Sequence, residues 1–178
     1  MKRILSVCIV LVWAMVAFAQ ESKIPQRLEL AEVEINDGEL DLEVFNMPDE
    51  WGNHYYLSVG HLGIGDDVIQ FQVDPLFELF IPLGETLDEA MAQLLKLQDL
   101  FKQAPGTSFD VIGNLALAFP NDKLEPVRVT YRKVLLSRML EFSIEREGYI
   151  RATHISRMDF NSIISSMKLY RKIHPKEL

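Results

Sequence analysis

Cysteine is nearly absent from this chain: Cys8 is the only one among 178 residues. A single cysteine cannot form an intramolecular disulfide, so a disulfide-stabilised framework is excluded. Basic charge is also scarce, with 18 Lys and Arg against 26 Asp and Glu and a formal net charge of −8. Because nucleic-acid binding needs clustered Lys and Arg to neutralise phosphates, we expect no nucleic-acid partner.

Motifs of common catalytic and nucleotide-binding sites are missing as well. No Gly-x-Ser-x-Gly sequence occurs, and no Gly-Lys-Ser or Gly-Lys-Thr. Gly60, Gly63 and Gly65 resemble a phosphate-binding loop, but strand-like residues follow where a helix would be needed. We therefore expect no cofactor and no catalytic residues. A hydrolase remains the alternative, because a Ser, a His and a carboxylate can converge from any order in the sequence.

The first 19 residues have the pattern of an export signal. Lys2 and Arg3 precede an apolar segment, and Ala17-Phe18-Ala19 has the small-x-small pattern that signal peptidases cleave after. The apolar segment is shorter than the ~20 residues of a membrane-spanning helix. We expect residues 1–19 to be removed and residues 20–178 to form one domain, periplasmic or secreted, with no transmembrane segment.

Cys8 lies inside this leader. Too few apolar residues precede it for a lipoprotein signal, so we do not expect lipidation there. Cleavage after Ala19 would leave a mature chain without a thiol. Such a chain can work in an oxidising compartment and has neither thiol catalysis nor thiolate metal ligands.

Hydrophobic periodicity predicts alternating groups of strands and helices. A capping-box spacing of Thr86 and Glu89 starts a helix that Pro105-Gly106 ends, and a second helix begins near Asp159 and ends at His174. The alternation of apolar residues over 28–35 changes phase near Ala31. The predicted strands cover residues 28–35, 40–44, 55–59, 68–73, 77–81, 109–118, 127–136, 140–146 and 149–155.

Each predicted helix has one apolar face that should pack on the sheet. In the first helix this face comprises Leu87, Met91, Leu94, Leu95 and Phe101. In the second it comprises Phe160, Ile163, Ile164, Met167 and Tyr170. The predicted fold class is α+β: a mostly antiparallel sheet with two main helices packed on it.

Charge is divided unevenly along the chain. Residues 28–122 contain nineteen acidic and two basic residues, whereas residues 123–178 contain twelve basic and six acidic ones. The two parts could neutralise each other across neighbouring strands. Alternatively, the bases could form a face for an acidic partner or a membrane surface. That face would comprise Arg128, Arg132, Lys133, Arg146, Arg151, Lys168, Arg171 and Lys172.

One loop and its neighbours supply the candidate binding residues. Trp51, Tyr55 and Tyr56 flank a Pro- and Gly-containing loop and could form an aromatic binding surface, although some of them could instead cap the core. His54 and His61 complete the candidate set. With Asp66 and Asp67 these histidines form the densest group of metal-ligand types, but their spacing fixes no coordination geometry, so we expect no metal site.

The order of features resembles PsbP-like domains, the extrinsic photosystem II proteins and their bacterial relatives. The resemblance rests on Phe45-Asn46-Met47-Pro48-Asp49-Glu50-Trp51, on residues 71–81 followed by Thr86-Leu87-Asp88-Glu89, and on residues 149–155 followed by 160–170 with Ser165-Ser166. It would cover about residues 28–171. It implies an α/β/α sandwich around an antiparallel sheet and a non-catalytic accessory role, and no functional residue matches a defined site of the family.

The sequence thus leads to two functional hypotheses. In the first, the protein is an exported, non-catalytic accessory or interaction domain whose partner is an envelope or extracellular protein. In the second, it binds a small, partly apolar ligand in a groove between the long helix and the sheet. The second hypothesis predicts a pocket of roughly 300 Å³ or more.

Overall fold

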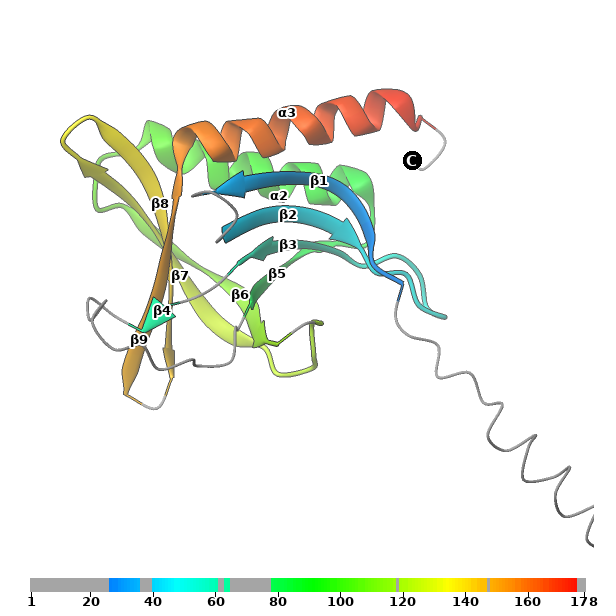
Figure 1. The fold of residues 1–178 in the computed structure, drawn as a ribbon, viewed down its shortest axis with the longest axis horizontal. Helices are drawn as coiled ribbons and strands as arrows, with labels where there is room; N and C mark the ends of the chain where they lie inside the picture. The colour runs from blue at the N-terminus through cyan, green and yellow to red at the C-terminus, as the bar shows by residue number, and fades with distance from the viewer. Residues whose placement is uncertain are drawn as a thin grey trace, which may run out of the picture.

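The computed structural model describes residues 26–35, 40–60, 63–64, 78–117, 119–146 and 148–175. Within these residues the strands form one sheet in the order β1-β2-β3-β5-β6-β7-β8-β9-β4, and all paired neighbours are antiparallel. Eight of the strands are long, and β4 (Gly63–Ile64) has two residues. Figure 1 shows that the sheet is strongly bent and that both helices lie in its concavity.

The first half of the sheet contains β1 (Leu28–Ile35), β2 (Leu40–Asn46), β3 (Tyr55–Val59) and β5 (Glu78–Gly84). Alternate residues of β2 and β3, such as Leu42, Val44, Leu57 and Val59, are fully buried on the helix-covered face. The phase change predicted near Ala31 is confirmed, because the β1–β2 register shifts between Glu29 and Ala31. The predicted strand over residues 68–73 lies outside the described residues.

The second half contains β6 (Ser108–Ala116), β7 (Glu125–Val134), β8 (Ser137–Arg146) and β9 (Tyr149–Ser156), with β4 beside β9. β6 joins the halves. Its last residues pair with β5 as far as Asn114↔Phe80, and its first residues pair with β7. At the divergence point stands Gly113, where an added Cβ would lie 2.5 Å from Val127 Cγ2 and 3.3 Å from the carbonyl oxygen of Phe80. Only glycine allows this close approach.

The first helix, α2 (Leu87–Asp99), continues into the short 3₁₀ helix η1 (Leu100–Lys102). Its predicted capping box is confirmed: Thr86 accepts a hydrogen bond from the Glu89 amide, and the Glu89 carboxylate accepts from the Thr86 amide. The helix buries Leu87, Met91 and Leu94 as predicted. The prediction that Leu95 belongs to the buried face is wrong, because this side chain is exposed. Leu97, which was not predicted, is buried instead.

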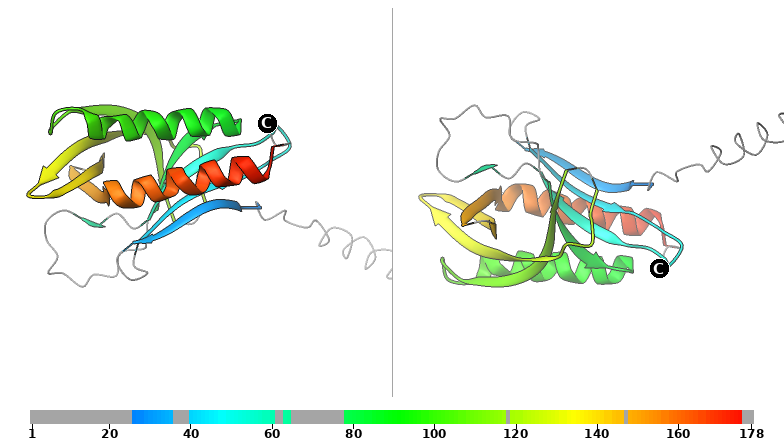
Figure 2. Two further views of the ribbon diagram at one scale, coloured as in Figure 1. Left: turned by 90° about the horizontal axis from the view of Figure 1, so that it is seen from above. Right: turned by 90° about the horizontal axis from the view of Figure 1, so that it is seen from below.

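The second helix, α3 (Arg157–Ile173), begins at Ser156, whose hydroxyl accepts a hydrogen bond from the Asp159 amide. It runs antiparallel to α2. Gln98 near the end of α2 donates a hydrogen bond to Asn161 near the start of α3, and Arg171 near the end of α3 forms an ion pair with Asp88 at the start of α2. Figure 2 shows the two helices side by side on the sheet.

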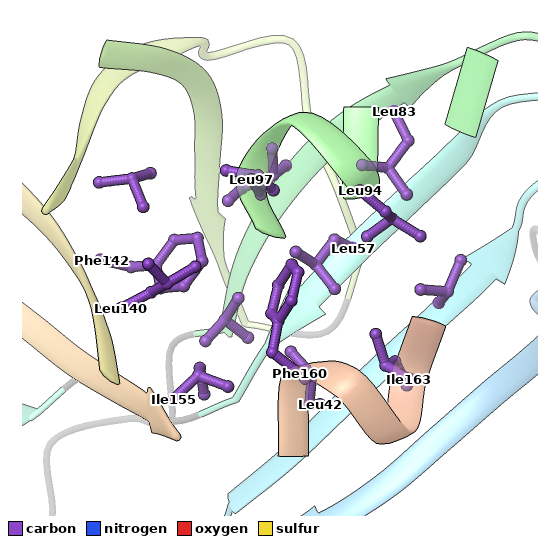
Figure 3. Packing of buried hydrophobic residues seen from close by; sticks show 14 of the residues in the cluster. Leu42, Leu57, Leu83, Leu94, Leu97, Leu140, Phe142, Ile155, Phe160 and Ile163 are labelled. Atoms are coloured by element: carbon purple, nitrogen blue, oxygen red, sulfur yellow. The ribbon is translucent and has the colours of Figure 1, made fainter. Parts of the chain in front are cut away.

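The main core lies between this helix pair and the concave face of the sheet (Figure 3). Phe160 from α3 is fully buried among side chains of both halves, and its ring centroid lies 6.2 Å from that of Phe101. The other labelled members in Figure 3 come from α2, α3 and strands of both halves: Leu42, Leu57, Leu83, Leu94, Leu97, Leu140, Phe142, Ile155 and Ile163. One continuous core therefore holds the two half-sheets together.

Among the described residues, the opposite, convex face carries one small hydrophobic cluster. Phe45 and Phe80 pack edge to face there with centroids 5.9 Å apart, and the Arg27 guanidinium lies 4.2 Å above the Phe45 ring. Arg27 also forms an ion pair with Glu43. Burial raises the pKa of Glu43, the largest effect on that group, although Arg27 opposes it. Polar residues such as Ser58 and Glu78 occupy neighbouring positions of this face.

The predicted fold class must be corrected. Helices do not enclose the sheet on both sides, so the α/β/α sandwich implied by the resemblance to PsbP-like domains is wrong for the described residues. The architecture is one antiparallel sheet of eight long strands, plus β4, with both helices on its concave face. The physical reason is that only this face offers a continuous apolar surface. On the convex face, apolar residues are interspersed with charged and polar side chains, which are well solvated without a covering helix.

Candidate functional site

A cavity lies between β1 and the last turns of α3, and we call it the β1–α3 groove. Its volume is about 380 Å³. In the left panel of Figure 2, α3 lies between α2 and β1, so the groove opens on the side of the sheet where the strand order ends. The lining residues are Glu29, Leu30, Ala31, Glu32, Ser166, Leu169, Tyr170, Ile173 and His174.

The helix side of the groove is apolar and solvent-exposed. Leu169 and Ile173 are one helical turn apart, and their exposed fractions are 57% and 61%. Between them Tyr170 turns toward the main core, and its ring stacks on that of His174 with centroids 4.2 Å apart. The helix ends here because the His174 amide donates the last hydrogen bond, to the carbonyl of Tyr170.

The strand side of the groove is shaped by the β-bulge in β1. The register shift between Glu29 and Ala31 makes Leu30 the additional residue, and Leu30 packs partly buried against the main core. Glu29 and Glu32 stand exposed beside it. The groove therefore has an apolar floor and helix wall, and the charged side chains along its strand side are acidic.

β1 is also an edge strand. It pairs with β2 alone in the described sheet, so no described strand forms backbone hydrogen bonds with its other edge. The acidic side chains along it are a common device against edge-to-edge pairing of identical copies. The site thus combines a strand edge that no described strand covers, exposed apolar side chains and negative charge.

A second, smaller cavity of about 200 Å³ lies where β5 and β6 separate beneath α2. Lys96 covers it from the helix, with its Nζ 5.4 Å from the centroid of the Phe109 ring. The ligand hypothesis predicted a pocket of roughly 300 Å³ or more between the long helix and the sheet. The cavity beneath α2 is smaller than that volume. The larger groove lies beside the other helix.

The predicted aromatic residues do not share one surface. Trp51 stands at the tip of its loop and is 84% exposed. Tyr55 is buried in the main core, whereas Tyr56, its neighbour in β3, lies on the convex face and stacks on Phe45 at 5.5 Å. Burial raises the pKa of the Tyr56 hydroxyl. Neighbouring residues of a strand point to opposite faces, and this separates the two tyrosines.

His54 belongs to the structure of the loop that carries Trp51. Its Nε2 lies 3.1 Å from Asp49 Oδ1, an ion-pair distance when the imidazole is protonated. Asp49 also accepts hydrogen bonds from the amides of Trp51 and Gly52, and the first of these is the main cause that lowers its pKa. His61 and the two aspartates predicted beside it, 66 and 67, lie outside the described residues. Among the described residues, no three His, Cys, Asp or Glu side chains converge as metal ligands would.

Several of the predicted basic residues are neutralised by acidic neighbours. Arg128 pairs with Asp110 at 3.0 Å and Arg171 with Asp88 at 2.7 Å, so both reach into the acidic part of the sequence. Arg132 pairs with Glu141 and Arg146 with Glu125 inside the basic part. These pairs break up the continuous basic face that the sequence allowed.

Sequence reasoning missed the groove residues Leu169 and Ile173. Ile173 lies three residues after Tyr170 and so continues the apolar face of α3, whereas Leu169 is one turn before Ile173 but outside the spacing of the buried residues. Such spacing does not tell where the sheet beneath the helix ends. Within the described residues, no helix combines the length and apolar character needed to cross a bilayer.

A scan against models of protein families finds no match to this chain, and searches of curated proteins and of solved structures find no significant match either.

Proposed function

We propose that this protein is an exported, non-catalytic interaction domain that binds an extended, basic polypeptide segment in the β1–α3 groove. The observation that carries the proposal is an edge of β1 with which no described strand pairs, beside an open groove with exposed apolar side chains. A segment laid along this edge would complete the backbone hydrogen bonds of β1, as in strand addition. Its alternate side chains would contact Leu30, Leu169 and Ile173.

The charge of the groove indicates what kind of polypeptide segment would bind there. Glu29 and Glu32 line its strand side, and Glu34 continues the acidic row along β1. A segment in which Lys or Arg alternates with Val, Ile or Leu matches both the acidic edge and the apolar wall. A second copy of the chain would bring its own acidic β1 against this one, and like charges on facing strands are unfavourable.

A small, partly apolar ligand is the second candidate occupant. Its support is the groove volume of about 380 Å³, which lies in the usual range of ligand pockets, about 300–1,000 Å³. Such a ligand would use the apolar wall but not the backbone edge of β1. The two candidates therefore differ in whether the β1 amides become protected.

A labelled hexapeptide of alternating Lys and Val tests the proposal by fluorescence anisotropy. We expect it to bind, to protect the amides of Leu28–Ile35 from hydrogen exchange, and to lose affinity by about tenfold or more in the double variant Leu169→Asp, Ile173→Asp. Leu124→Asp, at an exposed leucine outside the groove, is the matched control and should bind unchanged. A Glu–Val peptide of the same length should not bind.

Three results would contradict the proposal. The peptide could bind equally to the groove variant, or bind without protecting β1, or fail while a labelled fatty acid binds in the groove. The last result would favour the small-ligand candidate instead. The export part rests on the pattern of residues 1–19, and the N-terminal mass of the protein recovered outside the cytoplasm tests it separately.

A further inference from the structure

The turn between β7 and β8 exposes three consecutive apolar residues. Val134 ends β7, and Leu135 and Leu136 form the two-residue turn before β8 begins at Ser137. The exposed fractions of the two leucines are 91% and 98%. In both panels of Figure 2 this yellow turn forms one extreme end of the described molecule.

The backbone of this turn is strained by its own sequence. Leu135 has φ 55°, and it is the one described residue other than glycine with a positive φ. Two-residue hairpin turns usually place Gly, Asn or Asp at such a position, because these residues tolerate it. A leucine here weakens the turn and contributes no contact to the folded core. Strain kept at an exposed position suggests that the side chain acts outside the fold.

Basic residues stand directly behind the apolar turn. Lys133 and Arg138 face each other on the second pair from the turn, and Arg157 follows the end of β9, whose Ser156 pairs with Met139 of the same hairpin. In the described part of the chain none of these three bases forms an ion pair. The nearby acids are engaged: Asp99 pairs with Lys102, Glu141 with Arg132 and His154, and Asp159 with the Ser156 hydroxyl.

We propose that this hairpin end, defined as Val134–Leu136 with Lys133, Arg138 and Arg157, docks the protein on a bilayer that contains anionic lipids. The apolar turn would enter the boundary between headgroups and acyl chains, and the bases behind it would lie at the level of the anionic headgroups. Met158, exposed at the start of α3, adds apolar surface at the same end.

The shape of the hairpin end favours a bilayer over a protein partner. The apolar residues form a narrow, projecting turn, and none of them lines either of the two cavities described above. A protein partner would need a matching deep pocket, whereas a bilayer accommodates such a point directly. The order of apolar tip and basic collar also follows the order of acyl chains and anionic headgroups.

This inference does not depend on the proposed function, because the two sites lie at opposite ends of α3. Its 17 residues span roughly 25 Å at the rise of an α-helix. A molecule docked by the hairpin end would hold the β1–α3 groove away from the bilayer surface. Membrane contact and peptide binding could therefore occur together.

Vesicle sedimentation tests the inference with the full chain exported by its own leader. Vesicles of phosphatidylglycerol and phosphatidylcholine in equal parts should bind it, and pure phosphatidylcholine vesicles should bind it much less. The double variant Leu135→Asn, Leu136→Ser should weaken binding by about tenfold or more. Leu124→Ser removes an exposed leucine at the opposite end of β7 and should bind like the parent. All variants share one N-terminus, so any binding by that segment is common to them.

Two further measurements separate insertion from mere charge attraction. Lys133→Glu with Arg138→Glu should abolish the preference for anionic vesicles. Tryptophan emission of Leu136→Trp should shift to the blue on vesicle addition, whereas that of Leu124→Trp should not. Equal sedimentation of the tip variant and the parent would overturn the inference, as would absence of the shift. Loss of a protein partner in the tip variant without any vesicle binding would overturn it as well.

Discussion

The two ends of α3 carry exposed hydrophobic side chains in opposite settings. At its C-terminal end, Leu169 and Ile173 form the wall of a groove beside an acidic strand edge. Beyond its N-terminal end, Leu135 and Leu136 project on a strained turn with bases behind them. A concave, acidic surface suits an extended basic chain, whereas a convex, basic one suits an anionic bilayer. Exposed apolar residues are thus informative only together with their shape and charge.

The core between the two ends should control both. Phe160→Ala removes a fully buried ring that contacts residues of both halves of the core, so we expect a loss of about 3–5 kcal/mol in the free energy of unfolding. Leu169→Ala, on the exposed wall of the same helix, should change it by no more than about 0.5 kcal/mol. Urea unfolding of both variants makes the measurement. Similar losses in the two would mean that the groove wall is part of the core.

A substitution in the turn between β7 and β8 should instead raise the free energy of unfolding. Leu135→Asn replaces a leucine at positive φ with a residue that tolerates this conformation, so we expect a gain of about 0.5–1 kcal/mol. For a domain of this size that gain corresponds to a rise in Tm of about 1–4 °C. The same change should weaken vesicle binding, which separates the stability of the turn from its proposed role. A lower Tm in Leu135→Asn would show that the leucine stabilises the fold after all.

Local patterns in the sequence predicted the elements well. Thr86 and Glu89 correctly marked the start of α2, and the change of phase in β1 correctly marked its bulge. The arrangement of layers was wrong, because periodicity shows that a helix has an apolar face but not which face of the sheet receives it. The convex face also carries apolar residues, Phe45 and Phe80, and a helix covering that face would require residues of the same type.

The candidate sites were harder to predict, since they depend on where elements end. Leu135 and Leu136 were assigned to a strand, and the structure places them in a turn that lacks the Gly or Asn by which such turns are recognised. Leu169 and Ile173 follow helical spacing, yet the sheet below them stops at β1. Tyr55 and Tyr56 were grouped by their proximity in sequence, although strand geometry places them on opposite faces.

The smallest predicted effect is a pH dependence of stability, and it comes from Glu141 in the β7–β8 hairpin. Burial alone would raise the pKa of Glu141, but hydrogen bonds from Arg132 and His154 outweigh it and lower the pKa below its ordinary value of 4.5. A carboxylate with a lowered pKa stabilises the fold above the unfolded-state value, and this contribution is lost as the pH falls through the folded-state value.

We therefore expect Glu141→Gln to be less stable than the parent near neutral pH, by about 0.5 kcal/mol because solvent screens this pair. The difference should shrink as the pH falls from neutral through the lowered folded-state pKa of Glu141. Urea unfolding over a series of decreasing pH values measures it, and Glu34→Gln on the exposed edge of β1 is the control. A difference that stayed constant over the whole series would assign the role of Glu141 to packing. A difference that vanished would show that charge pairing keeps the acids near the hairpin engaged, which leaves Lys133, Arg138 and Arg157 as its available positive charges.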